Sequence, residues 1–137
     1  MTFTAADIDA TTRTVWGEAR GEGLAGWVAV IWVILNRARH PAWWGATPAQ
    51  VCEKPEQFSC RNANDPNDAK LEALSPTDPA YVAIETAVRA VFGGHIPDPT
   101  HGADHYEVIG TKAPWARGRT PSATIGHHAF YALGPSA

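Results

Sequence analysis

The sequence predicts a mainly α-helical (α+β) domain with a small antiparallel β element near the C-terminus. Three segments, about residues 4–21, 24–39 and 78–92, carry apolar side chains at helical spacing. Residues 101–110 and 124–132 instead alternate loosely and are rich in β-forming side chains, which predicts two paired strands. At 137 residues, the chain is expected to form one domain, residues 1–137, around one hydrophobic core.

The first two predicted helices form the centre of this interpretation. Thr4 and Asp7 are typical of a helix start, because their side chains can accept hydrogen bonds from unpaired backbone N–H groups. Gly21 and Gly23 are expected to end this helix. The next segment is apolar nearly all round over residues 27–35, which predicts a buried central helix. Its β-branched residues leave a strand as the alternative, although its length and cationic end favour a helix.

The remaining elements follow from helix starts and breakers. Pro41 is expected to stop the central helix, and Thr47-Pro48 predicts a short helix after it. Residues 53–69 are interpreted as a loop because Asn, Asp and Pro cluster there. Asp78-Pro79 predicts the start of the last helix, which Gly93-Gly94 should close. A long connection is expected between the two strands, and loops of that length are often functional.

Composition excludes several classes of protein. A net charge of −3 argues against a nucleic-acid partner, although residues 117–119 form a small basic patch. The longest apolar run falls far short of the roughly 20 residues that span a bilayer, so no membrane insertion is expected. The first residues lack a charged and an apolar signal region, which predicts synthesis in the cytoplasm without a signal peptide. Cys52 and Cys60 are expected to be free thiols, and a monomer is the default expectation.

Glu18 is the strongest candidate for chemistry. It lies at the border of the apolar face of the first predicted helix, just before a glycine turn where it can face a cleft. An apolar wall favours the neutral form of a carboxyl group, which is the form that protonates a glycosidic oxygen. The alternative is a solvated side chain held by Arg20 or Arg37. Glu22 is a second carboxylate at i+4, or else a charge at the start of the next helix.

The histidines form a second cluster. His101 and His105 are spaced i, i+4, and His127 and His128 lie on the other predicted strand. Residues four apart on a strand stand about 13 Å from each other, too far to share one metal ion. Adjacent residues on a strand point to opposite faces. No metal site and no other cofactor are therefore expected, and a zinc site remains the alternative.

Several motifs together resemble one known family. Val15-Trp-Gly-Glu-Ala-Arg-Gly-Glu22, followed by Gly26-Trp-Val-Ala-Val30 and Ile34-Leu-Asn-Arg37, resembles the cell wall hydrolase family typified by spore cortex-lytic (SleB-like) enzymes. Further matching segments are Gln57-Phe-Ser-Cys60, Gly102-Ala-Asp-His-Tyr106, Trp115-Ala116 and Ile125-Gly-His-His-Ala-Phe130. The resemblance covers about residues 10–131, and its Glu-Ala-Arg-Gly-Glu block is its most specific part.

The resemblance implies a lysozyme-like domain related to lytic transglycosylases. It implies cleavage of peptidoglycan glycan strands between N-acetylmuramic acid and N-acetylglucosamine, with Glu18 as the catalytic residue. It places His105, Tyr106 and His128 along the cleft. Asp104 and Glu107 depart from the family pattern beside them, which puts fine substrate contacts in doubt.

The mechanism expected from these residues needs one carboxyl group. Glu18 would act as acid and then as base, giving a 1,6-anhydro product, while Tyr106, His105 and Trp115 hold the sugar, with Glu22 and His128 as further substrate-binding residues. A hydrolytic muramidase would need a second carboxylate, such as Glu22, Asp104 or Glu107.

Two alternatives belong to other classes. A zinc amidase would use His101, His105 and His128, and a non-catalytic wall-binding module would use Trp43 and Trp44 as stacking platforms. Without a leader, the domain looks like a phage or prophage endolysin, released to the wall through a holin or by lysis.

Overall fold

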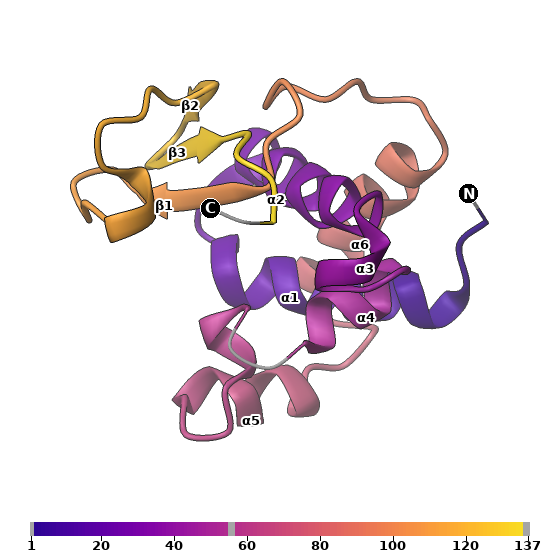
Figure 1. Ribbon diagram of the computed structural model, residues 1–137. Helices are drawn as coiled ribbons and strands as arrows, with labels where there is room; N and C mark the ends of the chain where they lie inside the picture. Colours follow the sequence, from indigo (N-terminus) through magenta and orange to yellow (C-terminus); the bar gives the residue numbers. More distant parts are fainter. Residues whose placement is uncertain (1, 55–56, 136–137) are drawn as a thin grey trace.

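The computed structural model describes residues 2–54 and 57–135. Helices form the body of the molecule, and a three-stranded sheet lies at one end of it (Figure 1). In chain order the elements are α1 (Ala5–Ala19), α2 (Gly23–Ala38), α3 (Pro41–Trp44), α4 (Pro48–Glu53), the 3-10 turn η1 (Ser59–Arg61), α5 (Pro66–Ala73), α6 (Pro79–Phe92), β1 (His105–Val108), the 3-10 turn η2 (Pro114–Ala116), β2 (Ala123–Ile125) and β3 (His128–Tyr131).

Helix α2 is the buried centre of the fold, as its apolar sequence predicts. Its residues from Val28 to Ala38 are all buried, and α1, α4 and α6 pack around it. Burying one such aliphatic side chain contributes about 1.5–3 kcal/mol, so the β-branched run is stabilised as a helix by tertiary packing. The alternative interpretation as a strand is wrong.

Helix α1 begins as predicted and ends earlier than predicted. The Thr4 side chain accepts from the Asp7 backbone N–H, and the Asp7 carboxylate accepts from the Thr4 N–H, which forms a complete capping box. The helix ends at Ala19, before the glycine expected to end it. Gly23 takes a φ of +77°, a left-handed conformation that glycine adopts without strain, and the chain turns there into α2.

Two segments differ from the sequence-based interpretation. The region interpreted as a loop over residues 53–69 contains η1 and the start of α5. Asp65 caps α5 by accepting from the Asn67 N–H at 2.8 Å, with Pro66 at the first helical position. The same Asp-Pro pair that suggested a loop is therefore a helix start. Pro41 likewise begins the short helix α3 rather than only ending α2.

The sheet has three antiparallel strands in the order β1-β3-β2. The predicted second strand, residues 124–132, is in fact the β2–β3 hairpin, which turns at Gly126 with a φ of +58°. In the register, Tyr106 pairs with Phe130 and Val108 with His128. Phe130 is fully buried against Ala29 of α2, so the sheet is anchored to the central helix. No helix among residues 2–54 and 57–135 has the length and apolar character needed to cross a membrane.

Candidate functional site

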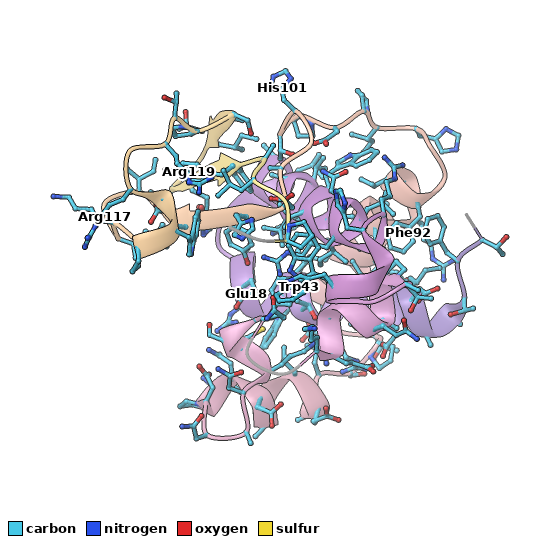
Figure 2. All side chains as sticks on the ribbon, in the orientation of Figure 1. Glu18, Trp43, Phe92, His101, Arg117 and Arg119 are labelled. Carbon is cyan, nitrogen blue, oxygen red and sulfur yellow. The ribbon has the colours of Figure 1, made fainter. Side chains whose placement is uncertain are left out.

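The Glu18 side chain lines a cavity of about 530 Å³ at the C-terminal end of α1. Figure 2 shows Glu18 below the sheet, between the β element and the α5 region. The cavity is lined by the end of α1, the turn to α2, and residues of β1 and the hairpin: Gly17, Glu18, Ala19, Arg20, Gly21, Glu22, Val108, His127 and His128. The helix end and the sheet together form a site in which a half-buried carboxyl group faces solvent.

Tyr106 of β1 holds the Glu18 carboxyl group. Its hydroxyl donates to Glu18 Oε1 at 2.7 Å. Burial, together with the adjacent Glu18 charge, raises the pKa of Tyr106 well above its usual value. Tyr106 therefore remains a neutral phenol at physiological pH and keeps its proton for this hydrogen bond. The two residues that the sequence placed together in a cleft are in direct contact.

The other Glu18 oxygen faces η1. Ser59 Oγ and the Cys60 backbone N–H lie 3.5 and 3.4 Å from Glu18 Oε2. Gly17 permits this approach, because a Cβ at that position would stand 2.7 Å from Cys60 Sγ. Sequence reasoning missed the contact: the Gln57-Phe-Ser-Cys60 motif marked the segment, but nothing in it indicated a role. Burial, then the Glu18 charge, raises the pKa of the Cys60 thiol, so it is a protonated neighbour and not a nucleophile.

No arginine forms an ion pair with Glu18 among the residues that the structure describes. Arg20 stacks over Trp16 and donates to its carbonyl oxygen, while Arg37 is buried and donates through Nε to the Asp104 carbonyl oxygen at 2.7 Å. The alternative of a Glu18 side chain neutralised by Arg20 or Arg37 is therefore wrong.

Glu22 lines the same cavity, but its carboxylate binds the hairpin. His127 donates its backbone N–H to Oε1 at 3.0 Å, and its Nδ1 lies 2.8 Å from Oε2. These two contacts lower the pKa of Glu22, the side-chain contact first, against the raising effect of burial. Gly126 keeps the turn close, since a Cβ there would stand 3.2 Å from Glu22 Oε1. Glu22 thus joins the α1–α2 turn to the hairpin.

His128 is buried beside these residues. Its Nδ1 lies 2.9 Å from Glu22 Oε1, but the angles do not make a hydrogen bond, so we interpret it as a close electrostatic contact. The ring packs edge-on against Tyr106, with centroids 5.2 Å apart. His127 and His128 were expected to point to opposite faces of a strand. That expectation is wrong, because His127 lies in the hairpin turn and His128 begins β3, so both rings approach the Glu22 carboxylate.

His105 and Trp115 lie elsewhere, on the other face of the sheet. Successive side chains of a strand point to opposite faces, so Tyr106 facing Glu18 turns His105 away. His105 Nδ1 lies 2.7 Å from Asp104 Oδ1, and its ring lies 5.0 Å from Trp115 and 5.9 Å from Trp44. Neither His105 nor Trp115 lines the Glu18 cavity, and Tyr106 reaches it only through its hydrogen bond with Glu18, although all three were predicted to hold one sugar.

Two further candidate carboxylates have structural partners. Buried Asp104 accepts from the backbone N–H groups of residues 133 and 134 at 3.0 and 2.9 Å. Burial raises its pKa, but the hydrogen bond with His105 and these two N–H groups produce a net lowering. Glu107 accepts from the Ala113 N–H and the Tyr131 hydroxyl. Of Glu22, Asp104 and Glu107, only Glu22 lines the cavity that holds Glu18.

The residues that a zinc amidase or a wall-binding module would use do not lie together. Across residues 2–54 and 57–135, no three His, Cys, Asp or Glu side chains are close enough together to hold a metal ion. His101, His105 and His128 therefore do not form the ligand set that a zinc amidase would need. Trp44 is a buried core residue, whereas Trp43 is 54% exposed with Lys54 over its ring, so the two do not form one stacking platform.

Known proteins are similar to this chain in sequence and fold. Residues 21–131 match the cell wall hydrolase family. The chain is 32% identical to the spore cortex-lytic enzyme of Bacillus subtilis over 129 residues, 93% of this chain and 38% of that protein. The corresponding enzyme of Halalkalibacterium halodurans is 32% identical over 126 residues, 90% and 34% of the two chains. The chain thus spans little more than a third of the length of these curated relatives.

Two solved structures have the same fold. One is the catalytic domain of the Bacillus cereus SleB protein, with a TM-score of 0.71 and 29% identity over 95% of this chain and 92% of that one. The other is the catalytic domain of the germination-specific lytic transglycosylase SleB from Bacillus anthracis, with a TM-score of 0.73 and 30% identity over 94% and 96%. The expected lysozyme-like, mainly helical fold with a small antiparallel sheet is confirmed.

Proposed function

This chain belongs to the cell wall hydrolase family, and from that premise we propose that it cleaves peptidoglycan glycan strands between N-acetylmuramic acid and N-acetylglucosamine as a lytic transglycosylase. The observation that carries the proposal is the hydrogen bond from Tyr106 to Glu18, whose carboxyl group lines the cavity. A structural neighbour described as a lytic transglycosylase supports the reaction type.

In the first step, protonated Glu18 gives its proton to the bridging oxygen while the bond from that oxygen to muramic acid C1 breaks. Positive charge develops at C1 in an oxocarbenium-like state. The resulting Glu18 carboxylate then takes the proton of the muramic acid C6 hydroxyl, whose oxygen bonds to C1. The product is a 1,6-anhydro ring, and Glu18 is protonated again. Tyr106 fixes the carboxyl orientation through both proton transfers.

The environment of Glu22 favours this route over hydrolysis. Hydrolysis with inversion needs a second carboxylate, about 6.5–9.5 Å from the acid, that is free to activate water. Among residues 2–54 and 57–135, Glu22 is the only other carboxylate that lines the cavity, and both its oxygens contact the hairpin histidines. A transglycosylase needs no second base, because the C6 hydroxyl of the substrate replaces water.

The test is mass spectrometry of the muropeptides that the protein releases from purified peptidoglycan. We expect 1,6-anhydro-muramic acid ends, unchanged by chelator, and no release by a Glu18→Gln variant of the same fold. Reducing muramic acid ends would instead establish a muramidase. Chelator-sensitive release of free peptides would establish an amidase, and binding to the wall without release of fragments would establish a wall-binding module.

The biological setting is a separate proposal: a monomeric phage or prophage endolysin that reaches the wall through a holin. Expression in a bacterial host with and without a holin tests it. Lysis only with the holin supports an endolysin, and lysis without it contradicts this role. Size-exclusion chromatography with light scattering measures the oligomeric state.

A further inference from the structure

A second cavity of about 310 Å³ lies on the other side of strand β1. Val108 lines the Glu18 cavity, whereas its neighbour Glu107 lines the second one. Adjacent residues of a strand point to opposite faces, so this single strand forms a wall of both cavities. The remaining lining residues come from the connection between β1 and β2 and from β3: Lys112, Ala113, Ala116, Arg117 and Tyr131.

The Glu107 carboxylate, which lines this second cavity, is held in place by two hydrogen bonds. Glu107 Oε1 accepts from the Ala113 N–H at 2.9 Å, and Oε2 accepts from the Tyr131 hydroxyl at 3.0 Å. Trp115 packs edge-on against the Tyr131 ring, with centroids 5.3 Å apart. The carboxylate and the phenol are therefore held by packing, and each Glu107 oxygen retains acceptor capacity for an ammonium group.

The two cationic side chains of this cavity form no ion pair within the described part of the chain. Lys112 and Arg117 are exposed, and within the described part of the chain neither has an acidic side chain at ion-pair distance. Arg117 projects away from the helical body, from the outer side of the sheet (Figure 2). Residues 108–137 contain three cations and no acidic residue, although the whole chain carries a net charge of −3. This part of the surface is electropositive beside an otherwise acidic molecule.

We propose that this second cavity is a subsite for the peptide stem of the substrate, in which Lys112 and Arg117 bind stem carboxylates and Glu107 binds a stem amino group. The proposal rests on the proposed function. The stem hangs from muramic acid, the sugar that Glu18 acts on, and it carries free carboxylates and, before cross-linking, a free amine. An extended stem of four residues spans about 13 Å. The two cavities share a wall, β1, which is an edge strand of the sheet.

The experiment compares two substrates that differ only in the stem. One is intact, solubilised peptidoglycan, and the other is the same glycan after an amidase has removed the peptides. The test variant is Lys112→Gln/Arg117→Gln, which removes both charges and leaves a polar side chain at each position. The matched control is Lys70→Gln/Arg89→Gln, which changes net charge equally at exposed positions on α5 and α6.

We expect the test variant to raise KM about three- to tenfold on intact peptidoglycan, because it loses two exposed charge contacts. Its kcat on intact peptidoglycan, and both KM and kcat on the stem-free glycan, should equal those of the parent. The control variant should behave as the parent on both substrates. An equal effect on both substrates, or none on either, overturns the subsite. Co-sedimentation of Glu18→Gln proteins with each substrate measures the same difference in binding without turnover. A parent protein that cleaves neither substrate therefore contradicts the proposed function alone.

Discussion

Replacing Glu22 by Gln decides whether the second carboxylate of the cavity is a structural clamp or a second catalytic group. Glutamine keeps an oxygen to accept from the His127 N–H but loses the charge that pairs with the imidazole at 2.8 Å. A hydrogen bond to a charged group contributes about 1.5–3 kcal/mol when well formed, and an exposed partner lowers that value. Because His127 is exposed, we expect Glu22→Gln to cost about 1 kcal/mol of the free energy of unfolding.

For a domain of this length, that loss lowers Tm by roughly 2–5 °C, which differential scanning calorimetry resolves. The loss should depend on pH. The folded-state pKa of Glu22 is lowered, so its ionised form stabilises the fold above the ordinary pKa of about 4.5, and this contribution disappears as the pH falls through the folded value. The Tm difference between parent and variant should therefore be full at pH 7 and shrink below pH 4.5.

Activity gives the second measurement. A clamp acts through the position of the hairpin, so Glu22→Gln should keep kcat within about tenfold of the parent. Loss of a general acid or base costs about 10²–10⁴-fold, the range expected for Glu18→Gln. If Glu22→Gln lost activity to that extent while unfolding at the parental Tm, Glu22 would be a catalytic carboxylate and the single-acid mechanism would be refuted.

Three further predictions concern the Tyr106 hydrogen bond, the close approach of Gly17 to Cys60, and the two buried thiols. Tyr106→Phe removes the 2.7 Å hydrogen bond to Glu18 and should lower kcat about 10- to 100-fold with little change in KM, measured on soluble glycan fragments; parental kcat would show that the phenol is dispensable. Gly17→Ala places a Cβ 2.7 Å from Cys60 Sγ and should destabilise the domain by about 1–3 kcal/mol in urea unfolding, whereas Gly21→Ala, with open space around it, is the neutral control. Both thiols are buried, so Cys52 and Cys60 should react with a thiol reagent only after unfolding; rapid labelling of the native protein would contradict this burial.

Local sequence signals predicted most of the helices because their causes are local. The side chains of Thr4, Thr47 and Asp78 accept from backbone N–H groups within one turn, and the Pro residues after Thr47 and Asp78 have no N–H group to satisfy. The same logic failed at Asp65-Pro66, where a helix start was embedded in residues that are also typical of loops. Only packing against the end of α1 distinguishes the two, and packing is not visible in a window of the sequence.

The site was predictable as far as single residues, and not as an arrangement. Glu18 was found from its position at a helix end, and Tyr106 from the family resemblance. Their contact joins residues 88 positions apart and depends on the register of β1 against β3. A strand shifted by one residue would exchange the faces of Tyr106 and His105. The sequence could not choose between these faces. His105 was expected along the same cleft as Tyr106, and the structure places it on the opposite face of the sheet.

The alternation along β1 also separates two kinds of chemistry that would interfere if mixed. The face with Tyr106 and Val108 adjoins two carboxyl groups, Glu18 and Glu22. Arg20 also lines that cavity, but its guanidinium stacks over Trp16, and no described lysine or arginine pairs with either carboxyl group. A cation paired with Glu18 would stabilise its ionised form and oppose its proposed role as an acid. The cations suited to stem carboxylates, Lys112 and Arg117, lie beyond the strand on the other face. In the proposed function, this four-residue strand therefore has the acid-catalysed reaction on one side and the recognition of stem carboxylates on the other.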